Sequence, residues 1–460
     1  MQSKKSTHFE ISERKILLRI IDAVVACFSI YFAKEVIGLS YFSTDDNYVI
    51  WFIVIAFYFL LFGTILEMYD LQKAESRYKI FKGLTITSSL VVVFFLMTPI
   101  YTPQLPANRL QIIYFFFSLL GFICVWRFAY VGLITAPRFY KRVLIVGENF
   151  DINAIILDLE KKDPNYEIVG YVDSDLNNVS ISKCNRYDVD ELQNAVEDLK
   201  ISEIIVTNSL QGVGLKLYQN LIPLLKKGYP IKAYTQVYEE LTGKIPVENV
   251  KNDFYCYFPF SRSNQNKLYL SFTRLADVLI ALLGLVFLII VIPFVLVINL
   301  FSNPGPLFYK QERVGKNGKK FKIVKLRSMV TNAEEKGAQW AVQNDTRITQ
   351  FGKVLRKSRL DEIPQFINVL KGEMSFIGPR PERPVFVEEL RKKIPFYEIR
   401  HVVKPGLTGW AQVNAKYASS EEDSLEKLQY DLYYIKRRNI FLDLRIFLKT
   451  LSTIVFFRGQ

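Results

Sequence analysis

Four long apolar stretches occupy the first third of the chain, and they limit its possible folds more than any other feature. They cover residues of about 16–37, 48–68, 84–101 and 110–134. Each comes close to the roughly 20 residues that an α-helix needs to cross a bilayer. The sequence therefore predicts a four-helix transmembrane domain over residues 1–137. A cleaved signal peptide is not expected, because the first stretch lacks a small-residue cleavage site and three more stretches follow.

Basic residues between these stretches indicate the orientation of the bundle. Lysines and arginines cluster before the first stretch, after the second and after the fourth, and they include Lys4, Lys5, Arg14, Lys15, Lys73, Arg77, Lys79, Lys82 and the run RFYKR at 138–142. The other two loops, 38–47 and 102–109, contain one arginine between them. By the positive-inside rule, the N-terminus and everything after residue 138 face the cytoplasm.

Short strand-like and helix-like segments alternate between residues 138 and 250. Strands are expected at 142–149, 167–175, 203–208 and 230–234, with helices between them. This alternation is typical of a doubly wound parallel sheet. We therefore expect an α/β Rossmann-like cytoplasmic domain over residues 138–250.

The first turn of that domain argues against a dinucleotide site. Such a site needs the pattern G-x-G-x-x-G, so that backbone amides can approach a pyrophosphate. This chain has Gly147-Glu148-Asn149-Phe150-Asp151, with one glycine and two acids where the phosphates would lie. A structural or regulatory role is favoured over nucleotide binding, and we expect no cofactor-binding residue here.

Another apolar region, residues 274–301, follows a polar and aromatic linker at 251–273. It is long enough to span a membrane, but Pro293 removes a backbone hydrogen bond inside it and predicts a kink. The segment 310–327 that follows is strongly basic, and a simple crossing would place its charges outside the cell. We expect a re-entrant helix that enters and leaves by the same face, with a plain fifth span as the alternative.

The charge balance indicates the class of partner. The formal net charge is +14 over 460 residues. Such an excess favours anionic partners, which include nucleic acid, anionic lipid and phosphorylated substrates. For a chain with these apolar segments we expect anionic inner-leaflet lipids and no nucleic acid. Four separated cysteines and two histidines offer no spacing typical of a metal site.

An acid pair and an arginine between prolines form the most specific pattern. Asp361 and Glu362 precede a short apolar run, and Arg380 follows within GPRP. As structure, Asp361 before Pro364 is a good helix N-cap. As chemistry, a carboxylate at a helix N-terminus among basic residues stays ionised and could attack phosphorus. Arginine binds two phosphate oxygens at once, and the flanking prolines restrict its backbone.

The segment from about 270 to 460 resembles the bacterial sugar transferase family, the monotopic polyprenyl-phosphate hexose-1-phosphate transferases. The resemblance lies in four blocks in the same order: FYKQERVGKNGKKFKIVKLRSM (308–329), LRKSRLDEIPQFINVLKGEMSFIGPRP (355–381), RHVVKPGLTGWAQVN (400–414) and YDLYYIKRRNIFLDLRIFLKT (430–450). The N-terminal spans and the Rossmann-like domain match the long form of this family. A mostly α catalytic domain over 274–460, with the re-entrant helix at 274–301, is therefore expected.

The resemblance implies a reaction. Family members move a sugar 1-phosphate from a UDP-sugar to undecaprenyl phosphate and release UMP, which starts an exopolysaccharide, capsule or O-antigen unit. The family's acid dyad falls on Asp361 and Glu362, with Asp361 as the nucleophile of a phosphosugar-aspartyl intermediate. Glu362 would help to bind Mg²⁺ or manage protons. The implied location is the bacterial inner membrane with the catalytic domain on the cytoplasmic face, and a homodimer is plausible.

Further site residues follow from the matched blocks. The resemblance assigns phosphate binding to Arg356 and Arg380, and Arg383 continues that pattern. Lys325 and Arg327 would contact the diphosphate or the uracil, with lipid headgroups as the alternative. The expected Mg²⁺ ligands are Asp361, Glu362 and Asp431, although Asp431 could instead support the dyad.

Some alternatives remain open at this point. A membrane-bound NAD-dependent sugar-nucleotide dehydratase combines similar domains but needs an intact glycine fingerprint. A non-enzymatic scaffold that binds polyprenyl phosphate needs no turnover. Asp345 and Arg347 are expected to form a salt bridge that orders a loop, and His401 is expected to be structural. The sugar cannot be read from these motifs.

Overall fold

The computed structural model divides the chain into two compact units, Met1–Tyr234 and Thr235–Gln460, which are described separately. The structure describes residues 11–42, 48–66, 68–69, 77–106, 108–134, 141–147, 153, 155–156, 159–160, 166–173, 184–207, 215–247, 264–333, 337, 345–415 and 420–455.

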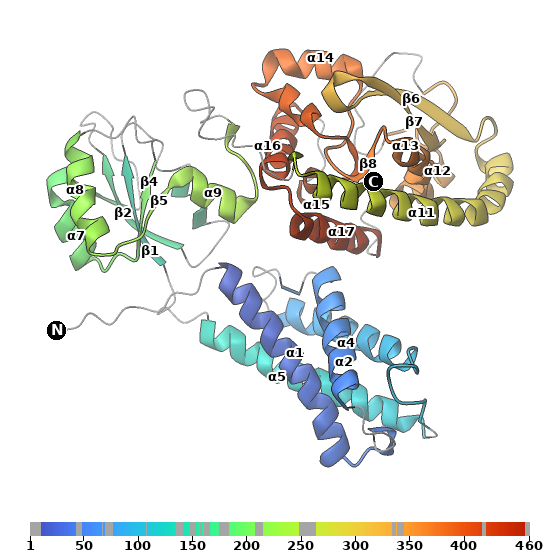
Figure 1. Cartoon of the computed structure of the whole chain (residues 1–460), viewed down its shortest axis with the longest axis horizontal. Coiled ribbons are helices and arrows are strands. Elements are labelled where there is room, and N and C mark those ends of the chain that lie inside the picture. Colours follow the sequence, from blue (N-terminus) through green and yellow to red (C-terminus); the bar gives the residue numbers. More distant parts are fainter. Residues whose placement is uncertain are drawn as a thin grey trace. The chain divides into compact units, whose positions relative to one another are not determined.

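The first unit contains a bundle of apolar helices at the four predicted stretches (Figure 1). Helices α1 and α4 each pack against both α2 and α5. Their bounds are Ile11–Glu35 for α1, Tyr48–Ile65 for α2, Arg77–Leu96 for α4 and Leu110–Ile134 for α5. Helix α4 ends earlier than predicted because Pro99 disfavours helical geometry in the residue before it.

Length and apolar composition allow four described helices to cross a membrane. These are α1, α2 and α5 of the bundle and the helix α11 (Lys267–Ser302) of the second unit, whereas the apolar part of α4, Ile80–Leu96, is shorter. The chain is therefore a membrane protein. Inside the bundle, Arg127 Nη2 lies 2.5 Å from Asp22 Oδ2 and both side chains are fully buried, as expected for charges that are stable in an apolar bundle when paired.

The first unit also contains the predicted parallel sheet. Its strand order is β3-β2-β1-β4-β5, and all neighbouring pairs are parallel. Val146 of β1 and Ile204 of β4 form one core with Leu192 and Leu221 of the helices α7 and α8. The bounds are Lys141–Gly147, Tyr166–Asp173, Asn185–Tyr187, Glu203–Val206 and Ile231–Ala233 for β1 to β5, and Leu192–Asp198 and Leu215–Lys226 for α7 and α8.

One strand of the sheet was not predicted, and one predicted turn lies outside the described residues. Strand β3 was not predicted, because Asn185–Tyr187 has three residues and no apolar run. The turn that was expected to lack a dinucleotide fingerprint begins at Gly147, and residues 148–152 lie outside the described part of the chain.

The second unit is mostly helical. The helices of its described residues are α9 (Tyr234–Thr242), α11 (Lys267–Ser302), α12 (Gln350–Lys357), α13 (Phe366–Lys371), α14 (Pro384–Lys393), α15 (Trp410–Asn414), α16 (Glu421–Arg437) and α17 (Ile440–Val455), with 3-10 helices η6 (Lys316–Gly318), η7 (Leu360–Gln365) and η8 (Tyr397–Val402). The basic segment at 310–327 contains a structure that was not predicted, an antiparallel hairpin of β6 (Phe308–Val314) and β7 (Lys320–Leu326). A short parallel pair joins β8 (Ser375–Ile377) to β9 (Gly406–Thr408).

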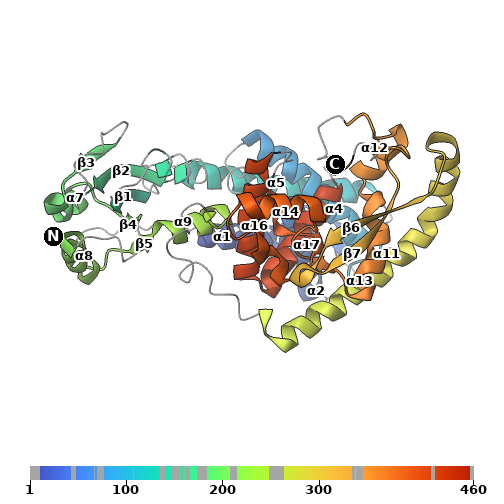
Figure 2. The same cartoon turned by 90° about the horizontal axis from the view of Figure 1, so that it is seen from above.

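Helix α11 is the long apolar helix of the second unit, and it has 36 residues with Pro293 inside. It begins before the predicted residue 274 because the Asn266 side chain caps it, accepting from the amides of Leu268 and Tyr269. Its axis changes direction before the helix ends (Figures 1 and 2). The side chain of Leu283 is 71% exposed and that of Phe294 is 69% exposed, so a large apolar surface is available to lipid.

The opposite side of α11 packs against the hairpin and α13. Ala281 packs with Ile323 of the hairpin and Val369 of α13. Gly284 is required for this packing, because a Cβ there would lie 2.2 Å from the Phe366 ring. The predicted salt bridge in the loop before α12 is confirmed, with Arg347 Nη2 2.5 Å from Asp345 Oδ2.

Candidate active site

The acid pair lies inside the 3-10 helix η7, which follows directly on α12. Arg359 precedes η7 with a left-handed φ of 57° and makes no side-chain cap. Asp361 and Glu362 occupy the first turn of η7, and each is 7% exposed. The expectation that Asp361 is an N-cap was therefore wrong: the turn at Arg359 starts the helix two residues earlier, so the Asp361 side chain is not used as a cap.

Glu362 is held by three cations. Its Oε1 accepts from Arg380 Nη2 at 2.7 Å and from Lys325 Nζ at 3.0 Å, and its Oε2 accepts from Arg359 Nη1 at 3.2 Å. Burial alone would raise the pKa of Glu362, but Arg380, Lys325 and Arg359 outweigh it and hold that pKa well below its usual range. Glu362 is thus an ionised anchor for the basic side chains around it.

Asp361 has a different environment from its neighbour. Among the residues that the structure describes, none forms a hydrogen bond or ion pair with its carboxylate. Burial and the charge of Glu362 raise the pKa of Asp361 to about 6, against the opposing charges of Lys325, Arg356 and Arg380. Near neutral pH this carboxylate is mainly ionised and keeps its oxygens available for chemistry.

Three of the predicted phosphate contacts come together around the pair. Arg380 reaches it from the GPRP loop after β8, and Lys325 reaches it from β7. Arg356 comes from the last turn of α12, where its Nε donates to Ser328 Oγ at 2.9 Å, and its charge acts on Asp361. Burial lowers the pKa of Lys325, although Glu362 opposes the effect. The result is a carboxylate with several basic side chains around it.

Arg327 has other partners than the acid pair, and its predicted contact with the diphosphate or the uracil stays a prediction. Its Nε donates to the Pro306 carbonyl at 2.7 Å, and its Nη1 and Nη2 donate to Asn303 at 3.0 and 2.5 Å. The guanidinium therefore ties the end of α11 to the end of β7. Arg383 precedes α14, where its guanidinium lies 5.7 Å from the centre of the Phe386 ring.

Asp431 is paired with an arginine, and its predicted role as a metal ligand stays a prediction. It is 1% exposed, and its Oδ2 accepts from Arg400 Nη2 at 2.9 Å. The same nitrogen donates to the backbone carbonyl of Arg380 at 3.0 Å, and Arg400 Nη1 donates to the Tyr397 hydroxyl. Asp431 thus supports the dyad indirectly, by fixing the arginine that holds the Arg380 backbone.

No group of three or more His, Cys, Asp or Glu side chains suited to a metal occurs within the described residues. Mg²⁺ is nevertheless often held by one or two carboxylates together with substrate phosphates and water. Asp361 has the donor chemistry for such a site. Both oxygens of Glu362 are already in ion pairs, so Glu362 is the weaker candidate ligand.

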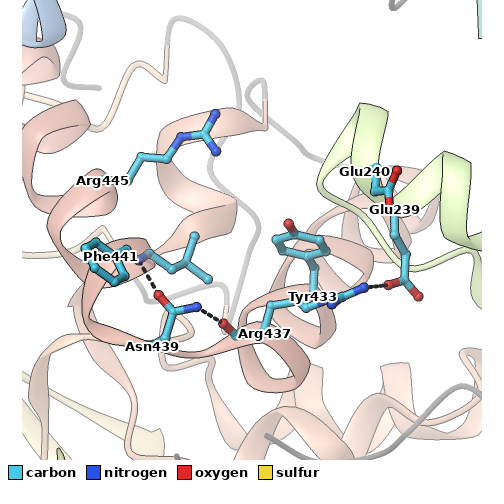
Figure 3. Close-up of a pocket in the computed structure, with 8 residues that line it drawn as sticks. Glu239, Glu240, Tyr433, Arg437, Asn439, Phe441 and Arg445 are labelled. Carbon is cyan, nitrogen blue, oxygen red and sulfur yellow. Dashed lines mark hydrogen bonds and ion pairs between the residues drawn. The ribbon is translucent and has the colours of Figure 1, made fainter. Parts of the chain in front are cut away.

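A hollow of about 350 Å³ opens elsewhere in the second unit, between α9, α16 and α17 (Figure 3). Glu239 forms one wall, where it pairs with Lys436 and Arg437. None of the predicted site residues lines the hollow, whose lining is Glu239, Glu240, Tyr433, Arg437, Asn439, Phe441, Leu442 and Arg445. The acid pair remains the candidate active site.

Sequence reasoning missed two contacts. It treated Arg359 as a general basic neighbour, but the left-handed turn brings its guanidinium to Glu362. It did not single out Arg400, although this residue opens the third matched block, because its partner Asp431 lies 31 positions away. Spacing in the sequence cannot connect residues so far apart.

Comparison with known proteins identifies the family of the chain. The model of the family described as bacterial sugar transferase matches residues 268–457. In Bacillus subtilis (strain 168), the putative undecaprenyl-phosphate N-acetylgalactosaminyl 1-phosphate transferase is 48% identical over 141 residues, which are 31% of this chain and 79% of that protein. The chain belongs to the bacterial sugar transferase family.

Two longer relatives match a larger part of this chain. The UDP-N-acetylgalactosamine-undecaprenyl-phosphate N-acetylgalactosaminephosphotransferase of Aeromonas hydrophila is 42% identical over 49% of this chain and 52% of its own length. The UDP-glucose:undecaprenyl-phosphate glucose-1-phosphate transferase of Xanthomonas campestris pv. campestris is 41% identical over 46% of this chain and 43% of its own. The chain thus spans about half the length of these curated relatives or less.

Proposed function

We propose that this protein transfers a sugar 1-phosphate from a UDP-sugar to undecaprenyl phosphate and releases UMP. The observation that carries the proposal is the ionisable carboxylate of Asp361, which has no partner among the described residues and lies among Lys325, Arg356 and Arg380. The names of the relatives supply the substrates, since they specify UDP-sugars and undecaprenyl phosphate. They also name two different sugars, so this chain's own sugar has to be measured.

In the proposed first step, Asp361 attacks the phosphorus that bears the sugar. A bond forms between an Asp361 carboxylate oxygen and that phosphorus, and the bond to the bridging oxygen of the diphosphate breaks. UMP leaves with the electron pair, and the sugar phosphate remains on Asp361 as an acyl phosphate. Arg356 and Arg380 donate to the phosphoryl oxygens, where negative charge gathers in the transition state.

In the second step, a phosphate oxygen of undecaprenyl phosphate attacks the same phosphorus. The bond to Asp361 breaks, the carboxylate is restored, and the product is a sugar linked to the lipid through a diphosphate. Glu362 keeps Lys325, Arg359 and Arg380 in place through both steps, since its ion pairs do not involve the reacting atoms.

The proposal includes Mg²⁺, which carboxylate and phosphate oxygens would bind jointly. When bound, it would neutralise charge on the diphosphate and assist departure of UMP. Asp361 would contribute a ligand before attack, and water and phosphate oxygens would complete the coordination shell.

The proposed setting is the cytoplasmic face of the bacterial inner membrane. Helix α11 would be re-entrant, bent at Pro293, so that the basic hairpin stays on the cytoplasmic side. Anionic inner-leaflet lipids would bind the basic surface. The sheet of the first unit would be a Rossmann-like domain with a structural or regulatory role, and a homodimer is part of the same proposal. The product would initiate an exopolysaccharide, capsule or O-antigen unit.

The test is UMP release from a panel of UDP-sugars by the detergent-purified protein with Mg²⁺ and undecaprenyl phosphate. We expect release beyond one UMP per enzyme to depend on the lipid with at least one sugar. Asp361→Asn should abolish release, and the control Asp198→Asn, which changes an exposed acid in α7, should retain it. Absence of release with every sugar, in protein shown to be folded, would support the scaffold alternative. Tight binding of NAD would favour the dehydratase alternative.

A further inference from the structure

Lys427 lies on α16 one helical turn before Asp431, and residues four apart lie on the same face of a helix. That face is directed at the network behind Arg380, since Asp431 binds Arg400 and Arg400 binds the Arg380 carbonyl. The charges that act on the Lys427 amine are those of Glu382, Arg380, Arg400 and Asp431. Lys427 therefore lies on the same side of α16 as the residue that anchors the GPRP loop through Arg400.

The two acids near Lys427 already have arginine partners. Glu382 Oε2 lies 3.5 Å from Arg313 Nη1, and Asp431 Oδ2 lies 2.9 Å from Arg400 Nη2. The Lys427 amine forms no hydrogen bond or ion pair with any residue in the described part of the chain. It is a partly buried cation next to other cations, with both nearby carboxylates engaged.

Such an arrangement is unfavourable without an anion. Burial lowers the pKa of the Lys427 amine, and the charges of Arg380 and Arg400 act in the same direction, against Glu382 and Asp431. An anion between Lys427 and Arg380 would offset the desolvation of the amine and the repulsion between the two side chains. A UDP-sugar has two phosphates. In the proposed reaction, the phosphate that bears the sugar lies at the acid pair with Arg356 and Arg380, so the other phosphate needs a binding residue of its own.

We propose that Lys427 is a further substrate-binding residue, which holds the phosphate that leaves with the nucleotide. Arg380 would lie between the two phosphates, with its Nη2 anchored on the acid-pair side by Glu362 and its backbone anchored by Arg400. The inference rests on the proposed function, because it assigns the second phosphate of the same UDP-sugar.

The test compares the binding of UMP and of uridine to the full-length protein by calorimetry in detergent. These two probes differ by the phosphate in question, and neither carries the sugar. For Lys427→Met we expect UMP to bind about tenfold more weakly or worse, the usual effect of losing a hydrogen bond to a charged group. Uridine affinity should not change. Lys427→Arg keeps the charge and should restore most of the UMP affinity.

Lys392→Met is the matched control, because it removes an exposed lysine from α14 in the same unit. It should bind UMP as the wild type does. Equal UMP affinity in the wild type and in Lys427→Met would overturn the inference. If Lys427→Met also changed the KM for the UDP-sugar while its UMP affinity stayed the same, Lys427 would contact the sugar and not the phosphate. If the wild type binds no UMP and releases none from any UDP-sugar, the proposed function fails and this inference fails with it.

Discussion

Asp361 and Glu362 are neighbours in the sequence, but their environments move their pKa values in opposite directions. Burial is common to both, and the difference comes from the cations. Arg380, Lys325 and Arg359 bind the oxygens of Glu362 directly, whereas Asp361 has no such bond and also experiences the negative charge of Glu362. One acid is therefore a fixed anchor, and the other is the candidate nucleophile.

The rate of UMP release should depend on pH through Asp361. Its pKa is raised to about 6, and attack requires the ionised form. We expect the rate to be nearly constant from pH 7 to 8 and to fall as pH decreases through about 6. A pH series of kcat/KM at saturating lipid measures this. A rate that stays constant down to pH 4.5 would contradict the assignment.

Glu362→Gln should shift the acid limb of the pH–rate profile, the fall in rate below about pH 6, and should also weaken the fold. Removing the charge of Glu362 removes one cause of the raised pKa of Asp361, so the limb should move to lower pH. The variant also leaves Lys325, Arg359 and Arg380 without their shared anion, which costs on the order of 3 kcal/mol for a buried ion pair. A pH series and a thermal melt check the two effects, and an unchanged acid limb would disprove the coupling.

At the residue scale, the sequence identified most of the side chains that meet at the acid pair, but not the direction of each one. The acid pair and GPRP were recognisable because both are local motifs. Lys325 and Arg327 seemed equivalent by sequence, yet one binds Glu362 and the other binds backbone around Asn303. Their difference arises because β7 ends at Leu326, and a strand end cannot be located to one residue from apolar pattern alone.

At the scale of elements, two polar side chains join helix α11 to the segment that contains α13 and β8. Arg274 donates to the carbonyls of Val369 and Leu370 at the end of α13, at 2.6 and 2.7 Å. Asp277 Oδ1 accepts from the Phe376 amide at 2.7 Å and from Ser375 Oγ at 3.0 Å. These bonds attach the apolar helix to the strand that leads into the Arg380 loop.

Asp277→Ala should therefore loosen the Arg380 loop, whereas Asp277→Asn should not. Both accepted bonds use one oxygen, which an asparagine can also supply. The alanine variant should lose about 1–3 kcal/mol of stability and most of its UMP release. Thermal melts and the release assay on both variants check this, and equal behaviour of the two would show that the hydrogen bonds are unimportant.

Elements with strong periodicity or long apolar runs were predicted from the sequence, and short ones were not. The four bundle helices, the parallel sheet and a long apolar helix near 274–301 follow from such patterns. The hairpin β6–β7 was missed because its seven-residue strands carry lysines and arginines among their apolar residues. Its stability depends on α11 and α13, which bury Ile323, and this tertiary contact is not visible in the strand's own sequence.

At the scale of the whole molecule, the segment after the sheet belongs to the second unit. Ile245 and Val247 are 0% and 1% exposed and join the core that contains Leu428 and Leu432 of α16. Trp410 Nε1 also donates to the Gly243 carbonyl at 2.8 Å. The sequence predicted that the Rossmann-like domain ends at residue 250, because the composition changes there. Composition does not show which hydrophobic core a segment joins.

A fragment of residues 235–460 should consequently be more stable than one of residues 250–460. The shorter fragment loses two buried aliphatic side chains, which corresponds to roughly 3–6 kcal/mol at about 1.5–3 kcal/mol each. Thermal melts of both fragments in the same detergent measure the difference. Equal melting temperatures would show that residues 235–249 contribute nothing to the unit.

The central claim is that Asp361 carries the sugar phosphate, and it can be tested directly without lipid. Incubation of the purified protein with its UDP-sugar and Mg²⁺, followed by rapid quenching and peptide mass spectrometry, should show a sugar phosphate on the peptide containing Asp361. UMP should appear in an amount close to that of the enzyme, and Asp361→Asn should abolish both signals. UMP release that requires undecaprenyl phosphate, with no adduct at any time point, would contradict the account and indicate direct transfer between the two substrates.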